Sequence, residues 1–243
     1  MAPGLDVATL DPNWTMKDDV LHVETADLPS PTKKKKLSQT KKFTAVEIAS
    51  FTAPLTNRHL LQSSPYGEPA HHLDLTTLDR PLQLFAKALT NMRWITQDYA
   101  TAPYPQAFNW DSIVDVFCRS MLAEQPDATQ EDLHLYVIVF RSRVNKTADR
   151  KLLGELDKAA HLEAVEGGGL LKYWFGTPND LGRNLATCLW RDRSDARRGG
   201  AGPGHALAMR AASRMYDEWF VERLRLTVSP SNGSWRFTTW VDD

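Results

Sequence analysis

The chain has 243 residues, 24% of them charged, and a formal net charge of -1. This balance gives no overall bias toward nucleic acid or anionic membranes, and no apolar run approaches the roughly 20 residues that span a bilayer. The first residues carry acids and no apolar core, so no secretory signal is expected. Cys118 and Cys188 lie in apolar segments without metal-ligand spacing and are predicted to be small core residues in a reducing compartment. We therefore expect a soluble protein of the cytoplasm or the nucleus.

Residues 1–64 are predicted to form a mostly disordered tail, because scattered apolar residues cannot offset the entropy of ordering. The tail holds a lysine-rich stretch made of Lys33 to Lys36, Lys41 and Lys42. This stretch is either an import signal, a phosphate-binding patch or, as we favour, a solvated tail. Residues 65–243 are expected to form one domain, which the segment FTAPLTNRHLL can join as an extended arm. The unusual loops YGEPAHHLDL and TAPYPQAFNW carry side chains that could cover this domain.

Helical periodicity begins at Asp79, a capping residue that is followed by a proline in the first turn. The first helix is predicted to end before TAPYPQ, where two prolines break the pattern. A second helix is predicted from Asn109, and the polar loop EQPDATQED closes it. Residues 79–125 thus form a helical pair that we expect to pack on the rest of the domain. The predicted buried faces are Phe85, Ala88, Leu89, Met92 and Ile95 in the first helix, and Ile113, Val116, Phe117 and Met121 in the second.

The hydrophobic period changes after Asp132. The segment LHLYVIVF, from Leu133 to Phe140, is short and rich in β-branched and aromatic residues, which predicts a central strand. Thr147 is expected to cap the next helix, and Gly167 to Gly169 to end it, since glycine tolerates left-handed backbone. The stripe predicted for this helix is Leu152, Leu153, Leu156, Ala160 and Leu162.

A pair of strands, a helical region and two further strands follow. The strands 170–175 and 185–190 are predicted to pair through the turn-forming loop PNDLG. The helical region runs from Ser194, is interrupted at GGAGPG, and has Ala208, Ala212, Met215, Tyr216 and Trp219 as its predicted buried face. The last two strands are expected at 223–228 and 235–240.

This order predicts an α+β fold. Residues 133–240 read β-α-β-β-α-β with an extra C-terminal strand, which is the ferredoxin-like arrangement of an antiparallel sheet with two helices on one face. The helical pair 79–125 precedes this unit, and the N-terminal tail precedes the pair. No internal repeat is present, so no solenoid is implied.

A cluster of charge lies where the strand ending at Trp190 meets the next helix. Asp192 or Ser194 can cap the helix, and Asp195 suits its dipole. Capping does not explain Arg191 and Arg193, since cations are disfavoured at a helix N-terminus unless they are paired. These arginines either belong to a structural corner, the interpretation we favour, or hold a carboxylate or phosphate.

Aromatic residues gather on the two strands that are predicted to pair. Because alternate residues of a strand face opposite sides, Tyr173 and Phe175 share one face and Trp174 takes the other. Together with Trp190, they could line an apolar pocket, a dimer seam or the ordinary core.

Two further side chains are candidates for proton transfer. His205, after GGAGPG, and Tyr216 fall in one helical region and could act as acid or base. A lone histidine is more often a cap or a hydrogen-bonded surface residue. The pair His71 and His72 lacks a third ligand at usable spacing, so no metal site is predicted.

The segments TAPYPQAFNWD, LLKYWFGTPNDLGRNLATCLWRDRSDA, GHALAMRAASRMYDEW and ERLRL together resemble a fungal family, uncharacterised protein family 0643. The resemblance covers residues from about 73 to the end. It implies a fungal, soluble, intracellular protein of general metabolism or of a secondary-metabolite gene cluster. The family label brings no activity and therefore carries over no catalytic residues.

A second resemblance is architectural. The strand and helix order is similar to that of dimeric α/β-barrel proteins, which include small cofactor-free monooxygenases, cyclases and EthD-like proteins. One hypothesis is an enzyme of the monooxygenase, cyclase or isomerase type that needs no cofactor and acts on a hydrophobic metabolite. In it, Tyr173, Phe175 and Trp190 line the pocket, Arg191 or Arg193 holds an acidic group, and His205 or Tyr216 moves a proton. The alternative is a non-catalytic module that binds a ligand or a protein through the aromatic sheet face. A homodimer fits the resemblance, although the N-terminal helical pair could occupy the dimer face. No membrane and no specific nucleic acid are expected as partners.

Overall fold

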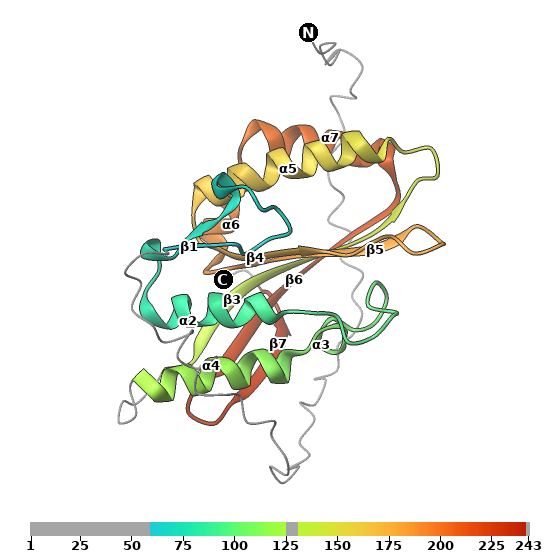
Figure 1. Ribbon diagram of the computed structural model, residues 1–243. Coiled ribbons are helices and arrows are strands. Elements are labelled where there is room, and N and C mark those ends of the chain that lie inside the picture. The colour runs from blue at the N-terminus through green and yellow to red at the C-terminus, as the bar shows by residue number, and fades with distance from the viewer. Residues whose placement is uncertain (1–58, 125–130, 242–243) are drawn as a thin grey trace.

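The computed structural model describes residues 59–124 and 131–241. Figure 1 shows three layers: one sheet in the middle, the helices α5, α6 and α7 on one side, and α2 and α4 on the other. We call the sheet face under α5–α7 the upper face and the face over α2 and α4 the lower face. The predicted tail up to residue 58, with its lysine-rich stretch, lies outside the described residues.

The main sheet has five strands, all antiparallel, in the order β4-β5-β3-β6-β7. They are β3 (Leu133–Val144), β4 (Leu170–Phe175), β5 (Arg183–Trp190), β6 (Tyr216–Ser229) and β7 (Ser234–Thr239). The chain order of the first four strands and their order across the sheet are those of the ferredoxin-like arrangement, and β7 extends the sheet beside β6. The predicted fold class is confirmed.

Three helices cover the upper face: α5 (Arg150–Gly167), α6 (Arg193–Gly199) and α7 (Pro203–Met215). The break predicted at GGAGPG separates α6 from α7. The end of α5 also falls where it was predicted, because Gly168 has a φ of 77° and terminates the helix. The N-cap is Asp149 rather than the predicted Thr147: the Asp149 carboxylate accepts from the N–H groups of Lys151 and Leu152.

The helical pair covers the lower face. It consists of α2 (Arg80–Ala88), which Asp79 caps as predicted, and α4 (Trp110–Glu124), with α3 (Tyr104–Ala107) between them. One 3-10 helix, η4 (Leu89–Asn91), follows α2. The main core lies between this pair and the lower face of the sheet, where Phe85, Ile113, Phe117, Val137, Val139 and Leu189 are fully buried.

The first helix of the pair is shorter than predicted. The stripe prediction extended it to Ile95, which is instead 58% exposed. The side chain of Asn109 accepts from the N–H of Arg93 at 2.8 Å, and the N–H of Ile95 donates to the carbonyl of Ala107 at 3.0 Å. These bonds hold residues 93–95 extended against 107–109, which outweighs the local helical pattern.

The last long strand starts earlier than predicted. Tyr216 and Trp219, expected on the helix, belong to β6. Glu218 pairs with Arg143 at 2.9 Å and with Arg183 at 2.8 Å, so three strands are joined by charge at this end of the sheet. These cross-strand ion pairs are long-range contacts, which helical spacing cannot reveal.

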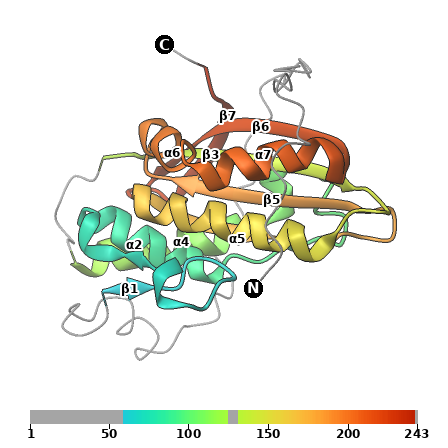
Figure 2. The same ribbon diagram turned by 90° about the horizontal axis from the view of Figure 1, so that it is seen from above.

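An N-terminal arm, residues 59–78, lies beside α5 and the edge strand β4 (Figures 1 and 2). Its elements are β1 (Leu60–Leu61), η2 (Pro69–His71), β2 (Leu73–Asp74) and η3 (Leu75–Thr77), and β1 pairs with β2. The N–H of Tyr173 in β4 donates to the carbonyl of Ser63 at 3.0 Å. The arm therefore covers part of an edge that would otherwise expose unpaired backbone groups, and ordered structure includes residues 59–64 of the predicted tail.

Candidate functional site

A carboxylate between α5 and the sheet accepts hydrogen bonds from two tyrosines. Asp157 of α5 receives the hydroxyl of Tyr173, from β4, at 2.5 Å on one oxygen and the hydroxyl of Tyr66, from the arm, on the other. The two phenols come from segments more than 100 residues apart in the chain. The fold thus assembles this site from the arm, the helix and the strand.

Two histidines lie next to this carboxylate. The Nδ1 atoms of His71, from the arm, and His161, from α5, are 2.9 Å apart, so one ring donates and the other accepts. His161 is only 4% exposed, and its Nε2 is buried without a hydrogen-bond partner. The ring of Tyr66 lies 5.0 Å from both imidazoles. We call Tyr66, His71, Asp157, His161 and Tyr173 the Asp157 cluster.

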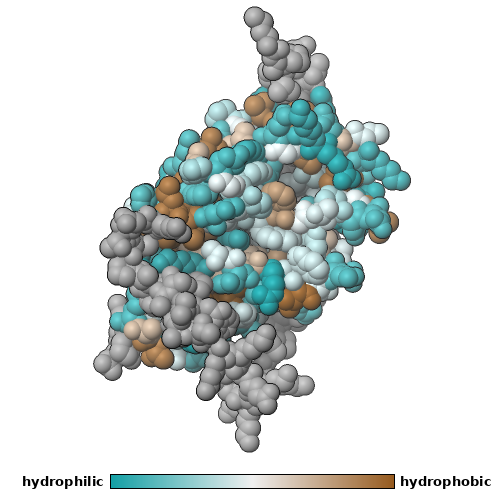
Figure 3. Space-filling model, viewed as in Figure 1, coloured by the Kyte–Doolittle hydropathy of each residue, from teal (hydrophilic) through white to brown (hydrophobic). Residues whose placement is uncertain are grey.

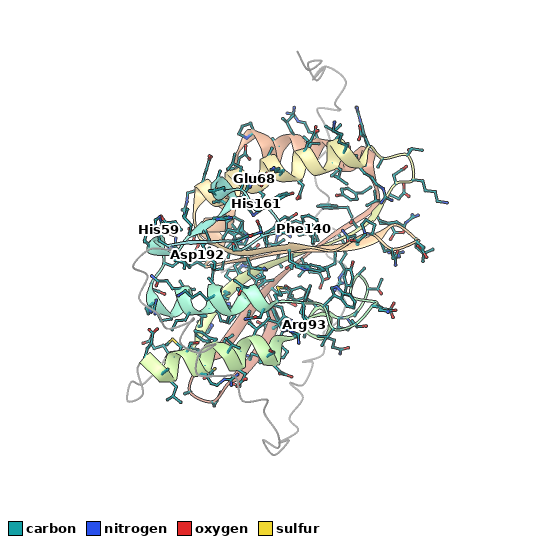
Figure 4. All side chains as sticks on the ribbon, in the orientation of Figure 1. His59, Glu68, Arg93, Phe140, His161 and Asp192 are labelled. Atoms are coloured by element: carbon teal, nitrogen blue, oxygen red, sulfur yellow. The ribbon has the colours of Figure 1, made fainter. Side chains whose placement is uncertain are left out.

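Local geometry explains why these residues meet. Asp157 and His161 are four residues apart on α5, so they share one face of the helix. Glu68 of the arm pairs with Lys158 of α5 at the exposed border of the cluster. In Figure 4, Glu68 and His161 lie close to each other beside α5. The arm therefore brings Tyr66 and His71 onto a helix face that already carries an acid and a base.

Burial controls the protonation of the cluster. Desolvation raises the pKa of the Asp157 carboxyl, which the hydrogen bonds from Tyr173 and Tyr66 counteract. Burial also raises the pKa of both phenols, and the negative charge of Asp157 raises it further. Desolvation lowers the pKa of His161 to about 3 and lowers that of His71 as well. At neutral pH the cluster therefore combines two neutral imidazoles and two neutral phenols around one carboxyl group.

Of the predicted aromatic residues, Tyr173 and Phe175 lie at this cluster. Their rings are 5.8 Å apart, and Phe175 is 6.2 Å from the ring of Tyr66. Trp174 faces the other side, as predicted, and packs on Phe108 in the lower core. Trp190 is 3% exposed and belongs to the small upper core, so it is covered by side chains.

The charged corner after β5 is held together by buried Asp195. Asp192 caps α6 by accepting from the N–H of Asp195 at 2.8 Å. Asp195 is 1% exposed and binds Arg191 through two bonds, of 2.6 and 2.9 Å, and also binds Arg198. Arg191 is thus an ion-pair partner within the corner. Arg193 points elsewhere: it hydrogen-bonds to Tyr136 of β3.

The two predicted acid–base residues lie within electrostatic reach of Asp157. The Nδ1 of His205 is 3.0 Å from the carboxylate of Glu163, which also accepts from the N–H groups of Gly204 and His205 at the start of α7. The charge of His205 opposes the effect of burial on the pKa of Asp157. Burial raises the pKa of Tyr216, and the charge of Asp157 raises it further. Tyr216 also stacks on Trp219 at 4.7 Å.

Sequence reasoning missed Asp157, His161, Tyr66 and the role of His71. The sequence suggests the pair His71 and His72 only as a metal site, and within residues 59–124 and 131–241 no group of three or more His, Cys, Asp or Glu residues is arranged so that it could hold a metal ion. The sequence offers one indication in α5, where Asp157 and His161 lie on the same side of the helix as Ala160 and Ala164. Their partners could not be identified from spacing, because His71 and His161 are 90 residues apart.

The fold and the site define a ferredoxin-like α+β protein with a partly buried carboxyl–tyrosine–histidine cluster beside an N-terminal arm. The chain belongs to the PB2B2.08-like family, whose model matches residues 62–239. A relative from Schizosaccharomyces pombe, UPF0643 protein PB2B2.08, is 37% identical over 195 residues, which cover 75% of this chain and 85% of the relative. The resemblance to uncharacterised protein family 0643 is confirmed.

Solved structures share only the general arrangement. A protein from Nitrosomonas europaea, assigned as an antibiotic biosynthesis monooxygenase, covers 40% of this chain and 92% of its own, with a TM-score of 0.33 and 12% identity. Rv0793 from Mycobacterium tuberculosis covers 45% of this chain and 97% of its own, with a TM-score of 0.33 and 14% identity. Within the described part of the chain, no helix is long and apolar enough to cross a membrane.

Proposed function

We propose that this protein is a small enzyme that moves protons on a hydrophobic metabolite without a cofactor, and that the Asp157 cluster is its active site. One observation carries the proposal: a carboxyl group that accepts from two phenols lies beside a buried histidine whose Nε2 has no partner. Buried polar atoms are normally hydrogen-bonded, so an unpartnered nitrogen on a 96% buried histidine is a place for a ligand atom.

The cluster contains the groups that an isomerase or cyclase needs. Asp157 as carboxylate can accept a proton from a carbon next to a carbonyl group, because burial raises its pKa and makes it a stronger base. A phenol of Tyr66 or Tyr173, neutral at pH 7, can donate to the enolate oxygen that forms. The proton then returns to another carbon of the same molecule. Isomerisation of this kind consumes no co-reactant, whereas the monooxygenase alternative would also need dioxygen.

The rings near the cluster suit a hydrophobic substrate. Phe175 is 37% exposed beside Tyr66 and Tyr173, and provides apolar surface at the entrance to the carboxyl group. His205 and Tyr216, the acid–base candidates of the sequence analysis, belong to the surroundings of Asp157 and would adjust the pKa of its carboxyl group. In this proposal Arg191 has no part, since Asp195 occupies its guanidinium group.

A strain of fission yeast that lacks the relative, complemented with this chain, provides the test. Asp157→Asn keeps the shape of the side chain and removes the base. We expect untargeted metabolite profiles in which the deletion differs from wild type, the unaltered chain restores the profile, and Asp157→Asn does not. Asp115→Asn, the same change on the exposed face of α4, should restore it.

Protein levels and urea midpoints of the purified variants separate loss of chemistry from loss of fold. If folded Asp157→Asn restores the profile as well as the unaltered chain does, the cluster is not the active site. If the deletion itself leaves the profile unchanged, the enzymatic proposal fails, and the binding alternative is favoured. That alternative has its own structural support in the partly exposed rings of Phe140 and Trp219 on the upper face, which are 5.5 Å apart.

A place in secondary metabolism and a cytoplasmic or nuclear location remain parts of this proposal, as does a homodimer. Helices of the same chain lie on both faces of the sheet (Figure 1). A dimer would therefore form through helices, loops, sheet edges or the partly exposed part of the upper face, and light scattering of the purified protein measures it directly.

A further inference from the structure

The central strand is buried on one side and partly exposed on the other. On the lower face, Val137 and Val139 of β3 are 0% exposed. On the upper face, the alternate residues Ile138 and Phe140 are only half-buried, although they lie on the middle strand of five. In Figure 2, β6 runs along the side of α7 that faces away from α5. Figure 3 shows a largely hydrophilic surface with small hydrophobic groups on the face it presents.

Three arginines meet at this uncovered part of the upper face. Arg225 of β6 lies opposite Tyr136 of β3, and Arg223, two residues earlier on the same face, lies opposite Ile138. Arg193 at the start of α6 hydrogen-bonds to Tyr136. Burial raises the pKa of the Tyr136 hydroxyl, while the charges of Arg223 and Arg193 act in the opposite direction.

Aromatic rings complete the cluster. The guanidinium carbon of Arg225 lies 4.7 Å from the ring centre of Trp240, a cation–π distance. The ring of Trp240 meets that of Tyr136 edge to face at 4.8 Å. Trp240 as a whole residue is half-buried. We call Tyr136, Arg193, Arg223, Arg225 and Trp240 the arginine–tryptophan cluster.

We infer that the arginine–tryptophan cluster is a binding site for an aromatic carboxylate or sulfonate. Guanidinium groups bind planar anionic groups through paired N–H donors, so each can contact a ligand while it also contacts a ring. The ring of Trp240 offers a stacking surface for an aromatic ring. An aromatic anion uses both features, whereas a simple anion uses only the charge.

This site is separate from the Asp157 cluster and does not depend on the proposed function. Tyr173, Cys188, Ile138 and Arg223 lie in one row across β4, β5, β3 and β6. Three strand spacings of about 4.8 Å put Arg223 about 14 Å from Tyr173 along the sheet. The backbones that carry the two clusters are therefore three strands apart.

A pair of fluorescent probes with the same rings tests the inference on the full-length protein. 8-Anilinonaphthalene-1-sulfonate is an aromatic anion, and N-phenyl-1-naphthylamine is its neutral counterpart. We expect Arg223→Gln with Arg225→Gln to weaken binding of the anionic probe about tenfold or more and to leave binding of the neutral probe unchanged. Arg119→Gln on α4, a matched change under the opposite face, should alter neither. Trp240→Leu should weaken binding of the anionic probe several-fold.

The urea midpoint of each variant verifies folding. Arg225→Lys is a milder second variant, because it keeps the charge but not the planar group. It should bind the anionic probe less tightly than the unaltered chain does. Competition at constant ionic strength adds a third measurement: benzoate should displace the anionic probe at concentrations at which inorganic phosphate does not. Equal loss of both probes, or unchanged binding of the anionic probe in folded variants, would overturn the inference. Equal displacement by phosphate and benzoate would overturn its aromatic part.

Discussion

Acidification should destabilise the protein through His161, and the change His161→Gln isolates this contribution. Burial lowers the pKa of His161 to about 3 from its ordinary value of 6.5. Between these two values the unfolded chain binds a proton that the folded chain does not, so stability falls as the pH falls below 6.5. From pH 7.5 to pH 5 the loss is about 2 kcal/mol, from one proton with these two pKa values.

Urea unfolding followed by tryptophan fluorescence at pH 7.5 and 5 measures this difference. We expect the unaltered chain to lose about 2 kcal/mol more stability between the two pH values than His161→Gln, which is about 1 M in urea midpoint for a typical slope. Asp157 titrates in both proteins, so the comparison removes its contribution. His71, whose pKa burial also lowers, is hydrogen-bonded to His161, so the measured difference belongs to this pair of histidines. His134→Gln, at an exposed position of β3, is the matched control and should behave like the unaltered chain. The same pH dependence in the unaltered chain and in His161→Gln would refute the reasoning.

Two further predictions concern the fold around the site and are checked by urea unfolding. Gly168 and Gly169 both have positive φ, 77° and 79°. A Cβ atom added at Gly168 would meet no atom within 4 Å, whereas a Cβ atom added at Gly169 would lie 2.7 Å from the Cβ of buried Asp195. We expect Gly168→Ala to lower the free energy of unfolding by about 1 to 3 kcal/mol. Gly169→Ala should lower it by at least about 3 kcal/mol more, because it displaces a buried ion pair. Equal losses in the two variants would contradict this expectation. Tyr104→Phe should cost about 1 kcal/mol, because it removes the buried 2.8 Å bond to Thr187, and an unchanged midpoint would count against that bond.

The sequence predicted elements well where a local pattern and a tertiary role agreed. The strand LHLYVIVF is apolar on both faces because it lies in the middle of a sheet that has helices on both sides, and its composition alone indicated that position. The capping by Asp79 and the stop at Gly168 depend only on residues within one turn. Errors arose where residues distant in the sequence determine the local structure. Asn109 holds the backbone near Ile95 extended, and Glu218 joins strands at a place where spacing alone predicted a helix.

The site was predictable only in part, for the same physical reason. Tyr173 and Phe175 were found because alternation on a strand fixes which residues share a face. Asp157 was not, since a single carboxylate in a helix of ordinary amphipathic composition is usually exposed. Its significance depends on Tyr66, which the arm delivers from 91 residues away. Arg193 was singled out for its unfavourable place at a helix start, but its neighbours Arg223 and Arg225 come from a strand whose register had to be known.

The arm connects folding to the proposed chemistry. Tyr66 satisfies one oxygen of Asp157, and His71 satisfies the Nδ1 of His161, so a detached arm would leave two buried polar groups short of partners. The same segment covers the edge of β4 through the carbonyl of Ser63. The family match begins at residue 62 and therefore includes this contact. An arm that only protected a sheet edge would not need to place a phenol on Asp157 and an imidazole on His161. If Asp157 is the base, a substrate that contacts its carboxyl group displaces the hydroxyl of Tyr66 or of Tyr173, and the contact that is given up must be replaced by a contact to the substrate.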